Sequence, residues 1–561
     1  QAGPLAALAP AEPVLALGRD LLEHPRAVAP ITTITAPPPG SSAAAHLYYC
    51  GQVLDEAERL AKQAFARLSA EERTFLAEAL PAVEAVFAEG KYLHTDEDLE
   101  RWGRSRRAIE LLARVERGRL LQALGFMARL SEARYLRQLK ADLTQAERTT
   151  GPSRWSAQGV EPGGRNLALS GEMVVCGSGP NVYRKDYRVV IDLGGDDTYL
   201  MPAASARPDR PAALLIDLEG DDRYQSTVAY SQGSAFMGVA LLVDLAGDDR
   251  YSAQGRFAQG SSFAGAALLV DAAGDDVYRA GTYAQGSALA QGLAGLIDLG
   301  GRDRYSGGVY VQGFAGPGAL GLLTDRGGDD EYAALGREPS GYGTPNAFRG
   351  MSQGASFGFR HVASGGIGVL YDQAGQDRYE AGNFSQGGGY YYGWGSLIDR
   401  GQGDDRYEGS RYAQGWAAHS ALGSCWDEGG NDRYRAWVGA GTGAAWDLSA
   451  TAFLDDAGDD DYQGSPVFTT GAAAHNGFSL FVDRGGRDRY LRPPGLSGPN
   501  TYHGGLSLAV FVDAGGEEDV YPEGFGDGIG RREGAVSLRL DLGEPLPADA
   551  TEVLKRLLEQ R

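Results

Sequence analysis

Two aspartates recur at a fixed distance from a tyrosine through most of the chain. In the stretch ALLVDAAGDDVY, Asp271 and Asp276 lie seven and two residues before Tyr278. The two preceding repeats carry the same phrase as LLVDLAGDDRY and LLIDLEGDDRY. Carboxylates are preferred ligands of Ca²⁺, and aspartates also accept backbone N–H bonds in turns. The phrase therefore predicts either a calcium-binding turn or a hydrogen-bonded turn.

Twelve copies of the phrase end in a tyrosine. One aspartate lies two residues before the tyrosine in every copy, and we call this position the second Asp column. Another aspartate lies seven residues before it, or eight in the copies with Asp399 and Asp513, and forms the first Asp column. A glycine precedes the tyrosine by four residues in all copies except the one with Glu517. The tyrosines are Tyr199, Tyr224, Tyr251, Tyr278, Tyr305, Tyr332, Tyr379, Tyr407, Tyr434, Tyr462, Tyr490 and Tyr521.

The spacing of these tyrosines predicts the fold. Most follow one another at 25 to 28 residues, apart from 47 residues before Tyr379 and 31 before Tyr521. Each unit holds short β-type runs divided by glycines and leaves no room for a helix. Such a period is typical of a solenoid, in which successive coils stack about 4.8 Å apart. We predict a mainly β protein: a parallel β-solenoid of about twelve coils with an N-terminal α-helical domain.

Stacking places like charges above one another. Two carboxylates about 4.8 Å apart repel by about 1 kcal/mol in water. Backbone N–H groups, with neighbours such as Arg223, Arg250, Arg304 and Arg406, are one form of compensation, and Ca²⁺ between turns is the other. The candidate metal ligands are Asp192, Asp197, Asp217, Asp222, Asp244, Asp249, Asp271, Asp276, Asp298, Asp303, Asp325 and Asp330.

The phrase GGDDTY resembles the repeats-in-toxin, or haemolysin-type, calcium repeat. Gly195, Asp197 and Tyr199 fill the glycine, aspartate and large-apolar positions of that repeat. The family repeats every nine residues and opens with paired glycines, whereas this chain repeats about every 27 residues and opens with Asp192. The resemblance covers one corner of each coil. It implies a secreted protein with calcium-stabilised turns.

A second set of residues departs from the repeat pattern. Eight residues before the first Asp column, four later coils carry Tyr391, His419, Asp447 and His475, where earlier coils carry Phe236, Phe263 and Ala290. Two imidazoles beside a carboxylate can bind Zn²⁺ or iron, or act as an acid–base group. His419, Asp447 and His475 are therefore the candidate catalytic residues. The alternative is that these histidines are ordinary polar surface residues.

Aromatic residues gather in the same part of the chain. Five of the seven tryptophans lie between 394 and 446. The candidate ligand-binding residues are Tyr391, Trp394, Trp416 and Trp446. Aromatic faces stack on sugar rings, so an aromatic groove over 390–475 would suit a glycan. The alternative is that these rings fill the interior of the solenoid.

The remaining segments set the expected domain boundaries. Residues 1–51 form a Pro/Ala-rich arm, 52–155 a helical domain, 156–545 the solenoid with a loop insertion near 334–352, and 546–561 a C-terminal capping helix. Ser69 with Glu72 makes a capping box. Between 98 and 148 the helical domain has twelve Lys or Arg against seven Asp or Glu. The arm and this basic domain could dock on a protein partner or on the solenoid itself.

Composition narrows the function classes. A formal charge of −22 argues against general nucleic-acid binding. No apolar run reaches the roughly 18 residues that span a bilayer, so we expect no transmembrane segment. Three cysteines do not make a disulfide framework. The chain starts at Gln1, from which we expect a removed signal peptide, with a lipidated cysteine upstream as an option.

Two functions from different classes follow from these observations. The first is a non-catalytic secreted, periplasmic or cell-surface scaffold or binding protein within a larger assembly. Ca²⁺ at the Asp corners is the candidate cofactor. The alternative is a polysaccharide-binding or polysaccharide-degrading enzyme that uses the aromatic groove at 390–475. The sequence leaves open whether the protein is an enzyme.

Overall fold

The computed structural model describes residues 34–88, 96–150, 157–360, 362–465, 467–498, 503–516 and 518–543. The expected capping helix at 546–561 and residues 1–33 of the expected arm lie outside these ranges. The chain divides into two compact units. The first unit comprises Gln1–Asp303 and Ala319–Leu322, and the second comprises Arg304–Gly318 and Leu323–Arg561. The repeat region is a parallel β-solenoid of about thirteen turns, which confirms the predicted fold class.

The helices found among the described residues all belong to the first unit. They are α2 (Ala43–Ala64), α3 (Ala70–Ala88), α4 (Asp96–Leu112), α5 (Arg117–Met127), the 3₁₀ helix η2 (Ala128–Ser131) and α6 (Ala133–Thr149). The expected boundary at residue 51 is wrong, because α2 already begins at Ala43. The capping box is confirmed, since the Ser69 hydroxyl accepts the Glu72 N–H at 3.2 Å and Glu72 accepts the Ser69 N–H at 2.8 Å.

Three sheets run through the first unit. The tyrosine sheet contains β1 (Val160–Glu161), β4 (Val182–Tyr183), β6 (Thr198–Tyr199), β8 (Arg223–Ser226), β11 (Arg250–Ala253) and β14 (Val277–Ala280). The long sheet contains β2 (Asn166–Ser170), β3 (Met173–Cys176), β5 (Val189–Ile191), β7 (Ala212–Ile216), β10 (Val239–Val243), β13 (Ala266–Val270) and β16 (Leu293–Ile297). The short sheet contains β9 (Ala235–Phe236), β12 (Ser262–Phe263) and β15 (Ala288–Leu289). Strand β18 (Leu320–Thr324) crosses the unit boundary.

The second unit repeats this three-sided plan. Its tyrosine sheet contains β17 (Arg304–Gly307), β19 (Glu331–Ala334), β22 (Arg378–Ala381), β25 (Arg406–Ala413), β28 (Arg433–Gly441), β31 (Asp461–Gly464) and β34 (Arg489–Tyr490). Its long sheet contains β21 (Ile367–Asp372), β24 (Trp394–Asp399), β27 (Leu422–Asp427), β30 (Ala450–Asp455), β33 (Phe478–Asp483), β35 (Ser507–Ala514), β37 (Ala535–Leu542) and β36 (Gly528–Arg532). Its short sheet contains β20 (Ser356–Phe357), β23 (Gly389–Tyr390), β26 (Ala417–Ala418), β29 (Ala445–Trp446) and β32 (Ala473–Ala474).

The tyrosines form the predicted ladder inside each unit. Successive ring centroids lie 4.6 Å apart for Tyr224 and Tyr251, and 4.8 Å apart for Tyr379 and Tyr407. Parallel pairing in register places each tyrosine directly against the next. One more coil precedes the twelve predicted ones, because Tyr183 stacks on Tyr199 at 4.7 Å. That coil was missed because it lacks the acidic phrase before its tyrosine.

A glycine is required where one coil approaches the next. Gly247 has φ of +143°, and a Cβ atom at this position would lie 1.5 Å from the carbonyl oxygen of Gly220 in the neighbouring coil. The Gln-Gly corner is also tightly built, with Gln232 in the left-handed region at φ +55°. Its Nε2 donates to the carbonyls of Tyr224 and Ser252, each at 3.0 Å. The glutamines thus join coils mainly through the backbone.

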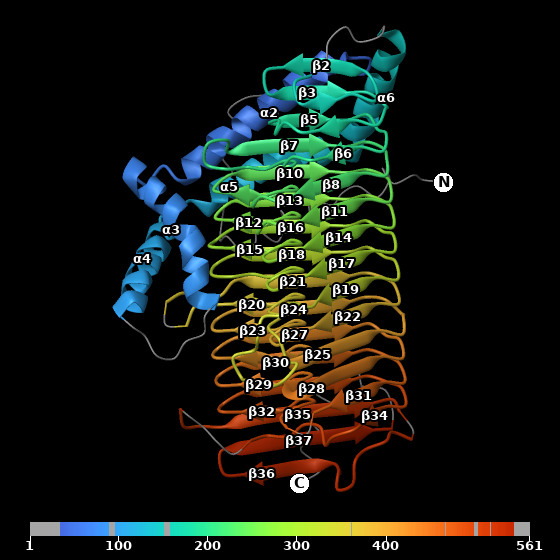
Figure 1. Cartoon of the computed structure of the whole chain (residues 1–561). Coiled ribbons are helices and arrows are strands. Elements are labelled where there is room, and N and C mark those ends of the chain that lie inside the picture. Colours follow the sequence, from blue (N-terminus) through green and yellow to red (C-terminus); the bar gives the residue numbers. More distant parts are fainter. Residues whose placement is uncertain are drawn as a thin grey trace. The chain divides into compact units, whose positions relative to one another are not determined.

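Helices α2 and α5 cover part of the long sheet in the first unit. Helix α2 packs on β2, β3, β5 and β7, and α5 packs on β10 and β13 (Figure 1). Ion pairs support this contact, including Arg188 with Asp55 at 2.8 Å. The partner of the helical domain in this structure is therefore the chain's own solenoid. The end of the Pro-rich segment is held by Asp142, whose carboxylate accepts the Gly40 N–H at 2.7 Å.

Candidate functional site

The first Asp column connects coils through tyrosine hydroxyls. The Tyr224 hydroxyl donates to Asp244 Oδ2 at 2.6 Å, and Tyr251 donates to Asp271 Oδ2 at 2.6 Å. The other oxygen, Asp244 Oδ1, accepts the N–H of Ala246 two residues later at 3.4 Å, as in an Asx turn. Burial raises the pKa of Tyr251 well above its usual value, so this hydroxyl keeps its proton and remains a donor.

The second Asp column connects coils through the backbone. Asp249 Oδ1 accepts the N–H of Asp222 in the preceding coil at 2.6 Å, and Asp276 Oδ1 accepts the N–H of Asp249 at 2.6 Å. These carboxyl groups are buried. The hydrogen-bonded turn expected from the sequence is therefore present, although in this column the bond runs between coils rather than within one turn.

The other carboxylate oxygen of the second column, Oδ2, accepts no such hydrogen bond. Within the described residues, Oδ2 is buried with no hydrogen-bond partner in Asp197, Asp222, Asp249, Asp276, Asp377, Asp405, Asp432, Asp460 and Asp488. A buried polar oxygen without a partner is costly, and its repetition in successive coils calls for a bound proton or a cation.

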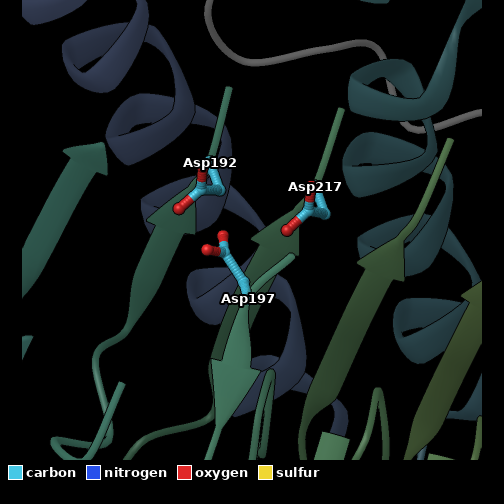
Figure 2. A group of neighbouring side chains, drawn as sticks. All are labelled: Asp192, Asp197 and Asp217. Carbon is cyan, nitrogen blue, oxygen red and sulfur yellow. The ribbon is translucent and has the colours of Figure 1, made fainter. Parts of the chain in front are cut away.

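Three carboxyl groups converge at each step of the solenoid. Asp192, Asp197 and Asp217 each offer one oxygen, and these atoms lie within 4.8 Å of one another. Figure 2 shows the carboxyl group of Asp197 turned toward those of Asp192 and Asp217. The same grouping recurs as Asp217, Asp222 and Asp244, and as Asp244, Asp249 and Asp271. These clusters could hold a metal ion, and their oxygen donors suit Ca²⁺ rather than softer metals.

The electrostatics of the cluster separate the two columns. Burial, followed by the charges of Asp192 and Asp217, raises the pKa of Asp197 to about 12. Burial and the charge of Asp192 also raise the pKa of Asp217, but the hydrogen bonds that it accepts keep the value at about 7. Without a cation, the second-column carboxyl therefore carries a proton that it can donate to its first-column neighbour. A cation would replace that proton.

The arginines beside the phrase do not compensate the Asp columns. Arg223, Arg250 and Arg406 are exposed, whereas the neighbouring aspartates are buried. The Nε atom of Arg304 lies 3.8 Å from Oε2 of Glu331 instead. The expectation that these arginines help to neutralise the columns is therefore wrong, because alternation along the strand points them away from the interior.

The structure brings Asp447 together with two histidines, only one of which the sequence indicated. His419 Nδ1 lies 2.5 Å from Asp447 Oδ2, and His503 Nε2 lies 2.7 Å from Asp447 Oδ1. Burial alone would raise the pKa of Asp447, but the hydrogen bonds to His419 and His503 outweigh it and hold that pKa below its usual value. His475 is buried, with its ring centroid 4.1 Å from that of Trp446. Burial lowers the pKa of His475.

His503 was missed although the sequence contains a signal for it. His419, Asp447, His475 and His503 follow one another at 28 residues. A count of eight residues back from the first Asp column does not reach His503, because the coil before Asp513 has a different length. The same count also misaligned the earlier coils: Phe236 pairs with Phe263 in the short sheet, so Met237 and Ala264 occupy the corner position of His419.

The four aromatic residues proposed for ligand binding do not share one surface. Trp416 is fully buried, and its Nε1 donates to the Ser385 carbonyl at 3.0 Å, so it belongs to the core. Trp446 is partly buried against His475. Tyr391 lies against Tyr392, with ring centroids 5.0 Å apart. Trp394 is exposed.

An apolar surface lies on the long sheet of the second unit. Three side chains on this sheet are exposed: Trp394 by 44%, Leu422 by 50% and Phe478 by 41%. They begin strands β24, β27 and β33; β24 pairs in register with β27, and β27 is joined to β33 through β30. Leu454, Leu480 and Val510 are partly buried on neighbouring strands. We call these six residues the exposed apolar face. In the first unit, by contrast, strands β7, β10, β13 and β16 are buried along their whole length.

Comparison with known proteins identifies no relatives: no family model matches the chain, and neither the curated proteins nor the solved structures include a match. Among the described residues, no helix has both the length and the apolar character needed to cross a membrane. The resemblance to the haemolysin-type repeat thus rests on the residues of the acidic phrase alone.

Proposed function

We propose that the protein is a non-catalytic, secreted or cell-surface β-solenoid scaffold that binds a protein partner through the exposed apolar face. The observation that carries this proposal is the register-aligned row of Trp394, Leu422 and Phe478, each more than two-fifths exposed. Contiguous exposed apolar surface commonly marks a protein-interaction site. Burying it stabilises a complex by about 25 cal/mol for each Å² removed from water.

An amphipathic helix of the partner is the occupant that this face fits best. In the first unit, the long sheet is already covered by helices of the chain itself, with α2 on β7 and α5 on β10. The strands of the second unit belong to the same sheet type and also present apolar side chains, but in an alternating pattern of buried and less buried positions. A helix supplied by another protein would complete the same packing.

The burial of the repeated polar residues also favours a scaffold. The two Asp columns and the tyrosine ladder recur from coil to coil, and between Asp192 and Tyr490 they are buried inside the solenoid. Their hydrogen bonds join one coil to the next. Residues that recur for stacking serve the packing of one coil on the next rather than a reaction, since a substrate would need access to them.

We propose further that Ca²⁺ occupies the Asp clusters. Each coil between Asp192 and Asp488 contributes two buried carboxyl groups, and one divalent cation at each step would neutralise both. The donor atoms are hard oxygens, and the partnerless Oδ2 of Asp222 and Asp249 lies where a cation could use it. The resemblance of the phrase to a secreted calcium repeat supports the same assignment and the extracellular location.

A photo-crosslinking experiment tests the scaffold proposal. A photoreactive amino acid placed at position 422 of the full chain, expressed in the source organism, should crosslink to an amphipathic segment of one partner protein. That segment, prepared alone, should bind the purified protein and lose at least tenfold in affinity with Leu422→Lys. The same amino acid at exposed Arg250 is the matched control. A crosslink to a second copy of this chain, to lipid, or to no defined segment would overturn the proposal.

Glycan binding is the second candidate function. It is favoured by Tyr392 and Trp394, both exposed beside the partly exposed His419, whose carbonyl accepts the Tyr392 N–H at 3.4 Å. Affinity electrophoresis in gels containing soluble polysaccharides should then show retardation that Trp394→Ala abolishes. Measuring released reducing ends separates binding from hydrolysis. Retardation that is equal for the protein and the variant would exclude this surface as the glycan site.

A further inference from the structure

We propose that His419, Asp447 and His503 form a binding site for one divalent transition-metal ion of the zinc type. This inference goes beyond the scaffold function and does not depend on it. Three of the seven histidines are spaced from Asp447 by multiples of 28 residues: His419 precedes it, and His475 and His503 follow it. Two of them, His419 and His503, contact Asp447. In a solenoid, this spacing places one donor on each of several successive coils. A site built across coils needs no motif that is local in sequence.

The donor atoms already converge on one carboxylate. Asp447 uses both oxygens, with Oδ2 2.5 Å from His419 Nδ1 and Oδ1 2.7 Å from His503 Nε2. Backbone pairing supports this geometry, since the His419 N–H donates to the Trp446 carbonyl and the Asp447 N–H to the Ala474 carbonyl, each at 3.2 Å. The corner residues His419 and Asp447 both have positive φ, at +62° and +52°. Their side chains consequently leave equivalent corners of adjacent coils.

The exposure of the three side chains suits an ion that enters from solvent. His419 is 19% exposed, Asp447 13% and His503 47%. Two protein nitrogens and one carboxylate leave a fourth position that water can fill, as in three-ligand zinc sites. The His475 ring, at the equivalent corner of the next coil, is buried against Trp446. The Asp clusters differ from this site, because they are buried and offer oxygen only.

The donor set selects the class of metal. Imidazole nitrogen with one carboxylate favours Zn²⁺ and neighbouring transition metals over Ca²⁺, which prefers six to eight oxygens. Zinc ligands at about 2.0–2.2 Å from the ion stand about 3.3 Å apart in a tetrahedral site. The two contacts of Asp447 must therefore open by about 0.8 Å at His419 and about 0.6 Å at His503. Half-exposed His503 can make that shift by rotating its side chain.

Cobalt substitution provides the test. The full chain is stripped with EDTA, dialysed into buffer with excess Ca²⁺ to fill the Asp clusters, and titrated with Co²⁺ while the visible absorption is recorded. We expect one Co²⁺ per chain with an intense tetrahedral spectrum, and its displacement by one equivalent of Zn²⁺. His503→Ala, at a half-exposed position, should weaken binding at least tenfold while the circular dichroism stays that of the wild type. His419→Ala and Asp447→Asn should do the same.

Asp456→Asn is the matched control. Asp456 is another carboxylate of the second unit, paired with Arg484 at 2.6 Å, and its loss should leave Co²⁺ binding unchanged. Two results would overturn the proposal: an absence of stoichiometric binding, or binding that survives His503→Ala and His419→Ala in protein that keeps its wild-type circular dichroism. Neither result bears on partner binding at position 422, so failure of this site and failure of the scaffold function remain distinguishable.

Discussion

Replacing Asp405 by asparagine should stabilise the metal-free protein near neutral pH. Asp405 belongs to the second Asp column, and its Oδ1 accepts the Asp377 N–H at 2.6 Å. Burial, followed by the charges of Asp399 and Asp427, raises the pKa of Asp405 from 3.8 to about 9. The folded protein must therefore hold a proton on this carboxyl group at a pH where the unfolded chain has released it. Asparagine keeps the acceptor and supplies N–H donors in place of that proton.

The sign and size of the effect follow from proton linkage. In the unfolded chain the Asp405 carboxyl group titrates near 3.8. Below that pH the folded and unfolded states both carry the proton, so the free energy of unfolding is not reduced by Asp405. The free energy of unfolding falls as the pH rises toward the folded-state pKa of about 9. At pH 7 the span is about three pH units, which corresponds to about 4 kcal/mol at about 1.4 kcal/mol per unit. Because an amide fits a carboxyl site imperfectly, we expect Asp405→Asn to gain about 2–4 kcal/mol at pH 7 and almost nothing near pH 4.

Urea unfolding in EDTA, followed by circular dichroism at both pH values, measures this difference. Asp404→Asn is the matched control: Asp404 is exposed on the same turn, accepts the Asn431 N–H at 2.9 Å, and should change stability by less than about 0.5 kcal/mol. Loss of stability in Asp405→Asn at pH 7 in EDTA would refute the proton-sharing argument. In excess Ca²⁺ the order should reverse, because the variant has lost a ligand carboxylate.

Further outcomes follow from the same contacts. Adding Ca²⁺ to EDTA-treated protein should raise the unfolding temperature, and an unchanged temperature would leave the shared proton as the explanation of the Asp clusters. Tyr251→Phe removes a hydroxyl that donates to the first Asp column and should lower the free energy of unfolding by about 1–3 kcal/mol in urea titrations. Gly247→Ala should prevent native folding, seen as aggregation in size-exclusion chromatography, because its Cβ would overlap a carbonyl oxygen. Trp416→Ala should cost about 3–5 kcal/mol and Trp394→Ala less than about 0.5 kcal/mol; equal losses would contradict their assignment to core and surface.

The repeat period was enough to predict the solenoid and its ladders. A chain that repeats at a constant length and pairs in register places equivalent residues above one another, so the Tyr224–Tyr251 stack follows from spacing alone. The clustering of Asp192, Asp197 and Asp217 follows in the same way. The coil of Tyr183 was missed because stacking requires only the aromatic ring, whereas the prediction required the whole acidic phrase.

Side-chain direction and contacts between unlike coils were decided by the tertiary structure. The sequence places Arg250 and Asp249 side by side, but the pleat exposes one and buries the other. The sequence does not distinguish Trp416 from Trp394. The geometry of the corner places Trp416 in the core, whereas Trp394 is exposed. His503 reaches Asp447 from a coil of unequal length. The repeat period predicts which residues stack on one another, and the backbone path at each corner determines the direction in which each side chain points.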